Sequence, residues 1–261
     1  MRAETLHPPL EEIAEIFRKH HGQLSSVVRY DRFRTSEELE EWVFLLGPDV
    51  LSLTHPHATA DITQRFISFN NNSGLTLDPE ENALLSLTPW IHDLGELIIE
   101  GEGVGDVSYE WKTGEDEKKE VVIFHRVLTD LPDGNVKDSI RKAYHEVAMG
   151  RGTKLGRMFN AIERIGYLET AIRAFLGIDG KKIKNWKGLM GNVLSNQIEA
   201  LLAYSSEYPY VAQFLKENME VISRMLDEAI AYEAPLSTDV IMYDHSKVQR
   251  AATAWRLNNL S

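Results

Sequence analysis

The residues with the clearest chemical potential are one imidazole and two carboxylates in a short run, His92, Asp93 and Glu96. Positions three and four apart share one face of a helix, so these side chains would converge if the run were helical. Imidazole nitrogens and carboxylate oxygens bind divalent cations, and a carboxylate that the metal does not use can transfer protons. The run therefore predicts a metal site with an acid–base group beside it.

The alternative interpretation of this run is an ordinary charged pair on a helix surface. The residues before the run argue against it, because they are strongly apolar and predict a segment that is being buried: Leu84, Leu85, Leu87, Trp90 and Ile91. Charges in such a place cost free energy unless they are paired or bound to metal. The apolar context therefore favours the metal site.

Composition limits the other classes of ligand. The chain of 261 residues has no cysteine, so any metal must be held by His, Asp, Glu or Asn. A formal net charge of -12 disfavours binding to a nucleic-acid backbone, which needs a basic face. We find no signal peptide and no long uncharged apolar segment, and therefore expect a soluble cytoplasmic protein with no membrane partner.

Apolar spacings of three and four residues recur along the chain, and strand signals are few, so we expect an all-α fold. The helices with the clearest patterns cover Glu11–His21, Glu115–Leu128, Val136–Met149, Leu155–Leu176, Asn192–Ala203 and Tyr210–Tyr232. Beyond Pro235 we interpret the chain as a loosely packed tail that ends in a short helix.

A further helix should begin near a pair of histidines. Proline is favoured at the first helical position, so Pro56 predicts that His55 caps this helix and that His57 is its second residue. A histidine in the first turn can point its ring out of the helix end toward a neighbouring helix. We therefore consider both histidines as candidate ligands.

The helix that leads into His92 should begin at Asp78, because a capping aspartate is followed there by Pro79 and two glutamates. Pro89 lies inside this helix and should kink it. A basic segment near residue 30 contains Arg29, Arg32 and Arg34, which we interpret as a solvated loop rather than a phosphate site.

The order of these features resembles the HD-domain metal-dependent phosphohydrolases, and most closely their 5'-deoxynucleotidase branch. The resemblance covers roughly residues 50 to 176. Its motifs are His92-Asp93-Leu94-Gly95-Glu96, then Gly105-Asp106-Val107, the charged run Glu115-Asp116-Glu117-Lys118-Lys119-Glu120, and Phe159-Asn160-Ala161-Ile162-Glu163-Arg164-Ile165.

This resemblance implies an HD-domain helical bundle, and the apolar spacings beyond it predict additional C-terminal helices. It divides the chain into N-terminal helices (1–49), a phosphohydrolase core (50–176) and a C-terminal helical extension with a tail (177–261). The apolar C-terminal helices would complete the core or form the face of a homodimer.

The resemblance also implies one divalent cation, and Mn, Co, Fe, Zn and Mg all suit its ligands. The implied ligands are His57, His92, Asp93 and Glu163, with His55 and Asn160 as alternatives. His57 is preferred because the family places its first histidine just after a helix begins. The family's last ligand is an aspartate, and Glu163 is one methylene longer.

The remaining roles follow from the same resemblance. Glu96 and Asp106 would be catalytic, and Lys118, Lys119 and Arg164 would contact the substrate phosphate. The implied activity is release of phosphate from (deoxy)ribonucleoside 5'-monophosphates. The alternatives are an HD phosphohydrolase for a nucleoside triphosphate, a cyclic nucleotide or another phosphate ester, and a non-catalytic binding module on the HD scaffold.

Overall fold

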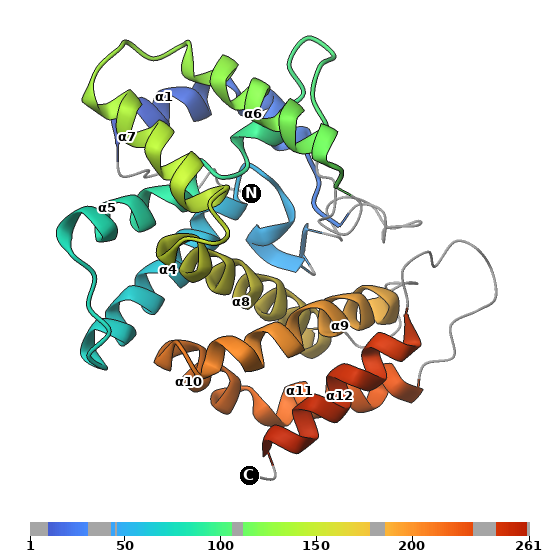
Figure 1. Ribbon diagram of the computed structural model, residues 1–261. Coiled ribbons are helices and arrows are strands. Elements are labelled where there is room, and N and C mark those ends of the chain that lie inside the picture. Colours follow the sequence, from blue (N-terminus) through green and yellow to red (C-terminus); the bar gives the residue numbers. More distant parts are fainter. Residues whose placement is uncertain are drawn as a thin grey trace. The chain divides into compact units, whose positions relative to one another are not determined.

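The computed structural model describes residues 10–30, 43–44, 46–105, 112–177, 186–231 and 244–259. Within these ranges the protein is all-α, as predicted (Figure 1). Extended pairing among the same residues is confined to two isolated bridges, Val28–Leu51 and Ile99–Glu102. None of the described helices combines the length and the apolar character that a transmembrane span requires.

The chain forms two compact units that interleave along the sequence. The first comprises residues 1–29, 48–64 and 77–160, and the second comprises residues 30–47, 65–76 and 161–261. Two helices, α4 (His55–Asn72) and α8 (Lys154–Gly177), contribute residues to both units. The division into segments 1–49, 50–176 and 177–261 stays a prediction.

The first unit contains the predicted metal-binding run. Besides its parts of α4 and α8, its elements are α1 (Glu11–Lys19), α2 (His21–Ser26), α5 (Pro79–Leu87), the 3-10 turns η3 (Thr88–Trp90) and η4 (Leu94–Glu96), α6 (Gly114–Leu128), α7 (Asn135–Ala143) and the π-helical turn η5 (Tyr144–Ala148). Helix α6 packs on η4, and α5 packs on both α7 and η3. These contacts place the run between α5 and α6.

The second unit is built on α9. Its helices beyond α8 are α9 (Trp186–Ser205), α10 (Pro209–Glu217), α11 (Met219–Ala231) and α12 (His245–Asn259). Helix α9 packs against each of the other three, and α11 packs on α12 (Figure 1). Helix α12 buries Val248, Ala251, Ala252 and Trp255. The predicted C-terminal helix is therefore present, longer than expected and packed on α9 and α11, and the predicted loose segment before it lies outside the described residues.

Local side-chain bonds explain where two helices of the first unit begin. Asp78 accepts a hydrogen bond from the Glu81 backbone N–H, and Pro79 occupies the first position of α5, which confirms the predicted start. Thr113 and Asp116 form the same reciprocal capping arrangement at the start of α6. This cap fixes the position of the neighbouring Lys112.

Two predicted helices are interrupted. The helix from Asp78 ends at Leu87, because Pro89 lacks an N–H and forces the chain into the short turns η3 and η4. The predicted Tyr210–Tyr232 helix is two helices, α10 and α11. Between them Asn218 donates a side-chain hydrogen bond to the Phe214 carbonyl, at 2.9 Å, which ends α10.

Candidate metal centre

Three metal-binding side chains meet in the first unit: His55, His92 and Asp93. The Nε2 atoms of His55 and His92 lie 3.0 Å apart. One carboxylate oxygen of Asp93 lies 3.2 Å from the His92 Nε2, and the other lies 3.5 Å from the His55 Nε2. All three side chains are nearly buried. This group can hold a divalent metal ion.

The local fold brings the two histidines together from different elements. Helix α4 begins at His55 rather than at Pro56, because the backbone N–H groups of Thr54 and His55 already bond to the Leu51 carbonyl. His92 lies in the turn between η3 and η4, where its backbone N–H bonds to the Thr88 carbonyl at 3.0 Å. The break at Pro89 therefore determines where His92 points.

The second nitrogen of His92 fits a metal ligand. Its Nδ1 lies 2.9 Å from the Pro89 carbonyl oxygen, which accepts only from an N–H. That bond assigns the proton to Nδ1 and leaves the lone pair on Nε2, the atom that faces His55. A backbone carbonyl behind the ring is the usual way in which proteins orient a metal-binding histidine.

Arg29 anchors Asp93. Its Nη1 donates to a carboxylate oxygen of Asp93 at 2.7 Å, and its side chain is only 5% exposed. Backbone bonds hold Arg29 in place, since its N–H donates to the Val50 carbonyl. Our interpretation of Arg29 as part of a solvated loop was therefore wrong, and Arg32 and Arg34 lie outside the described residues.

The charges around Asp93 keep it ionised. Burial alone raises the pKa of Asp93, but its electrostatic interactions with His92, Arg29 and His55 outweigh burial and hold that pKa well below its usual value. A carboxylate that stays ionised at every working pH is suited to binding a cation.

A second charged cluster lies beside the group. The Lys112 ammonium lies 2.6 Å from a Glu120 oxygen and 3.4 Å from a Glu96 oxygen. Burial lowers the pKa of Lys112, but the two glutamates more than offset it and raise that pKa above its usual value. Burial raises the pKa of Glu120, and the charge of Lys112 only partly opposes this. Glu96 therefore sits at the end of a buried acid–base network.

Tyr144 packs against this network. Burial raises the pKa of its hydroxyl, and the charges of Glu120, Glu96 and Asp93 raise it further. Its oxygen approaches Gly95, where a β-carbon would stand 2.8 Å from the Tyr144 Oη and 2.7 Å from the Glu120 carbonyl. Gly95 thus lets η4 and α6 approach closely.

Sequence reasoning missed Lys112 and Glu120. Lys112 stands just before the capping threonine of α6, where nothing in a single sequence distinguishes it from a solvated lysine. Glu120 did carry a signal, because it falls on the apolar stripe of α6 with Ile123, Phe124 and Val127. An acid on such a stripe is buried and needs a partner.

The group formed by described residues contains some of the predicted ligands and not others. His55, which was the alternative, joins His92 and Asp93, whereas the ring of His57 packs edge-on against Trp90 with centroids 4.8 Å apart. Asn160 belongs to the first unit and Glu163 to the second, and the group formed by described residues includes neither.

Two of the predicted substrate residues are exposed lysines of the first unit. Lys118 and Lys119 are exposed on α6, and Lys119 lies 3.3 Å from Glu115 one turn away. In the second unit, Arg164 donates to the Asn196 carbonyl at 2.9 Å and to the Gln197 side chain at 2.7 Å. Asp106 lies outside the described residues.

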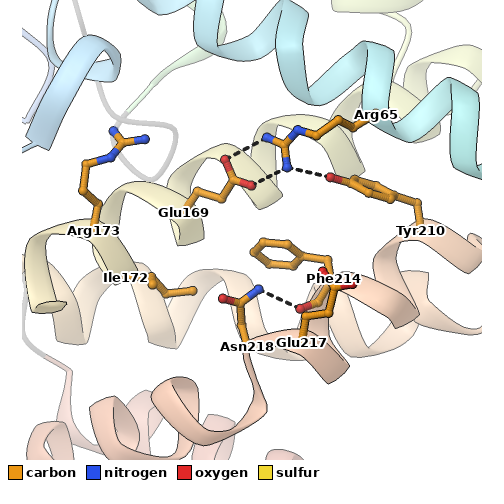
Figure 2. A pocket seen from close by; sticks show the side chains of 8 residues that line it. All are labelled: Arg65, Glu169, Ile172, Arg173, Tyr210, Phe214, Glu217 and Asn218. Atoms are coloured by element: carbon orange, nitrogen blue, oxygen red, sulfur yellow. Dashed lines mark hydrogen bonds and ion pairs between the residues drawn. The ribbon is translucent and has the colours of Figure 1, made fainter.

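A pocket of about 260 Å³ opens in the second unit (Figure 2). In it the Arg65 guanidinium donates to both oxygens of Glu169, at 2.8 and 3.1 Å, and to the Tyr210 hydroxyl, at 2.7 Å. These bonds join α4, α8 and α10. We assign them a structural role, because the charges of Arg65 and Glu169 already neutralise each other.

Comparison of the chain with protein-family models, with curated proteins and with solved structures yields no match. The candidate metal centre is therefore defined by its own geometry.

Proposed function

We propose that this protein is a metal-dependent phosphohydrolase of the HD-domain type. The observation that carries the proposal is the convergence of His55, His92 and Asp93, with the His92 Nδ1 bonded to a carbonyl and Asp93 anchored by Arg29. Two imidazoles and one carboxylate leave coordination positions open, as in hydrolytic metal sites that also bind water or substrate.

The neighbouring residues supply what a hydrolytic site needs. A divalent cation in such a group polarises a phosphoryl oxygen and lowers the pKa of bound water. Glu96 is the nearest buried carboxylate along the chain, and its backbone N–H bonds to the Asp93 carbonyl at 3.0 Å. We assign Glu96 the proton transfer, to or from water or the leaving oxygen. Lys112 positions Glu96 through their ion pair.

The substrate class follows from the resemblance in sequence. We propose (deoxy)ribonucleoside 5'-monophosphates, because the residues His92-Asp93-x-x-Glu96 and Gly105-Asp106-Val107 match the nucleotidase branch. A nucleoside triphosphate, a cyclic nucleotide or another phosphate ester would use the same metal chemistry, and the products distinguish these substrates.

The test is phosphate release from a panel of nucleoside mono- and triphosphates, with and without added Mn²⁺, Co²⁺ and Mg²⁺. We expect metal-dependent release from monophosphates and its loss in Asp93→Asn, which keeps the size of the side chain but removes its charge. Asp138→Asn is the matched control, since Asp138 is exposed and pairs only with Arg141 among the described contacts.

The outcomes separate the alternatives. Release of triphosphate from a deoxynucleoside triphosphate would move the proposal to another HD activity. Bound metal without release from any phosphate ester would favour the non-catalytic module. A chain that neither binds metal nor is stabilised by it would overturn the proposed function altogether.

A further inference from the structure

A second pair of histidines faces each other on the surface of the first unit. The Nε2 atoms of His125, in α6, and His145, in η5, lie 3.1 Å apart, and both side chains are exposed. Their ring centroids are 5.1 Å apart and their ring planes 29° apart, so the Nε2 atoms lie closer together than the ring centres. We propose that His125 and His145 form a second binding site, for a divalent transition-metal ion.

The spacing of the two nitrogens matches that of two ligands on one ion. Ligands at the usual Zn–N distance, with angles between octahedral and tetrahedral, lie about 3.0 to 3.4 Å apart. The pair at 3.1 Å falls in this range, and so does the pair His55–His92 of the candidate metal centre at 3.0 Å. The two imidazole pairs therefore share this nitrogen spacing, although their ring planes differ, at 60° for His55–His92 and 29° for His125–His145.

The backbone next to the pair is held firmly. Phe124 and Tyr144, which precede the two histidines in sequence, stack face to face with centroids 3.6 Å apart and planes 8° apart. Tyr144 and His145 open a π-helical turn, a distortion that proteins often use at functional sites. The buried stack thus fixes two neighbouring residues whose imidazoles meet outside it. Such preorganisation lowers the entropic cost of binding an ion.

The surroundings of the pair also suit a metal. The cation that precedes His145 by one helical turn is Arg141. Arg141 is itself neutralised by Asp138, at 2.7 Å. Imidazole pairs select Zn²⁺, Cu²⁺, Ni²⁺ or Co²⁺, whereas Mg²⁺ and Ca²⁺ need oxygen ligands. Two protein ligands leave the other positions to water or to a further ligand.

Calorimetric titration of the full chain with Zn²⁺ tests the site. We expect two ions per wild-type chain, one in His145→Gln and one in His92→Gln, with no binding of Mg²⁺ at the pair. His21→Gln is the matched control, because His21 is also an exposed histidine of this unit. The His21→Gln variant should still bind two Zn²⁺ ions per chain. Imidazole ¹⁵N spectra should show Zn²⁺ shifting the Nε2 resonances of His125 and His145.

The two metal sites fail independently in this design. If the wild type binds one ion that His92→Gln loses and His145→Gln keeps, the second site is overturned while the first stands. If the wild type binds one ion that only His145→Gln loses, the second site stands and the first is overturned. Unshifted His125 and His145 resonances at saturating Zn²⁺ would also overturn the second site.

Discussion

Asp93 contacts both histidines of the candidate metal centre and Arg29. Its two oxygens face the two imidazoles, and one of them also accepts from Arg29. Removing a metal ligand and removing the group that orients it should therefore both weaken metal binding, but to different extents. A positioning residue acts through its ligand, and its loss costs less than the loss of the ligand itself.

We predict that Arg29→Gln weakens metal binding about 10- to 100-fold, the usual effect of removing a group that orients a ligand. Titration with Mn²⁺ would measure this change. Arg18→Gln is the control, since Arg18 is exposed and pairs with Glu11. Equal affinities in Arg29→Gln and the wild type would show that Arg29 does not position Asp93.

Lys112 should matter for stability as well as for chemistry. Lys112→Met leaves Glu96 and Glu120 buried beside each other without a cation, which we expect to cost about 3 to 5 kcal/mol of the free energy of unfolding. Lys142→Met, which removes an exposed partner of Glu80, should change it by less than about 0.5 kcal/mol. Urea denaturation would measure both.

The loss of stability that Lys112→Met causes should depend on pH. An acid whose folded-state pKa is raised favours the folded state at low pH and loses this stability as the pH rises through that pKa. The pKa of Glu120 is already raised, and loss of Lys112 removes the charge that opposes this. We therefore expect the deficit to be largest near pH 7 and to shrink toward pH 4.5. A deficit that grows on acidification would contradict this account.

At the residue scale the sequence identified part of the centre. His92 and Asp93 were found because they are adjacent and follow an apolar run. Arg29 was missed because its partner lies 64 residues away, and a basic segment without a visible partner looks solvated. The selection of His55 over His57 depends on which ring the first turn of α4 directs toward His92 and Asp93, and this depends on packing that a single sequence does not show.

At the scale of elements, the end of α5 before Pro89 places the metal-binding residues on short turns. Pro89 ends the helical run, so His92, Asp93 and Glu96 lie on short turns rather than along one α-helical face. Helix α6 then brings Glu120 close to η4, and Gly95 allows this approach. The sequence predicted that Pro89 would kink this helix, whereas the helix ends at Leu87. The sequence could not predict the direction of the chain after Pro89, because that depends on packing against α6.

We predict that Gly95→Ala destabilises the fold by about 1 to 3 kcal/mol, because its β-carbon would meet a backbone oxygen at 2.7 Å. The control is Gly114→Ala at the start of α6, where a β-carbon meets nothing within 4 Å. Thermal unfolding of the two variants makes the comparison. Equal midpoints would show that η4 and α6 do not approach this closely.

At the scale of the whole molecule, the two units share α4 and α8. The all-α class followed from the spacing of apolar residues alone. The interleaving of the units did not, because it depends on contacts between segments far apart in the chain. The sequence left open whether the C-terminal helices complete the core or form the face of a homodimer. The buried residues of α12 pack within the second unit, and the homodimer stays a proposal.

We predict that the two units unfold together, since continuous helices pass through both. Calorimetry should show one transition, and saturating Mn²⁺ should raise the midpoint temperature of the whole transition. At a hundredfold excess of Mn²⁺ over Kd, the free energy of unfolding should rise by about 2.7 kcal/mol. Two transitions, of which Mn²⁺ moves only one, would show that the units unfold separately.

The most direct test of the metal centre compares His55→Gln with His57→Gln in the Mn²⁺-dependent release of phosphate from deoxyribonucleoside monophosphates. The two residues lie in the same turn of α4, but only His55 faces His92 and Asp93. We predict that His55→Gln abolishes phosphate release and metal binding at this centre, whereas His57→Gln retains both. Loss of metal binding and phosphate release in His57→Gln, with both retained in His55→Gln, would contradict the assignment of His55 as the ligand. Wild-type protein without metal-dependent release would contradict the proposed reaction.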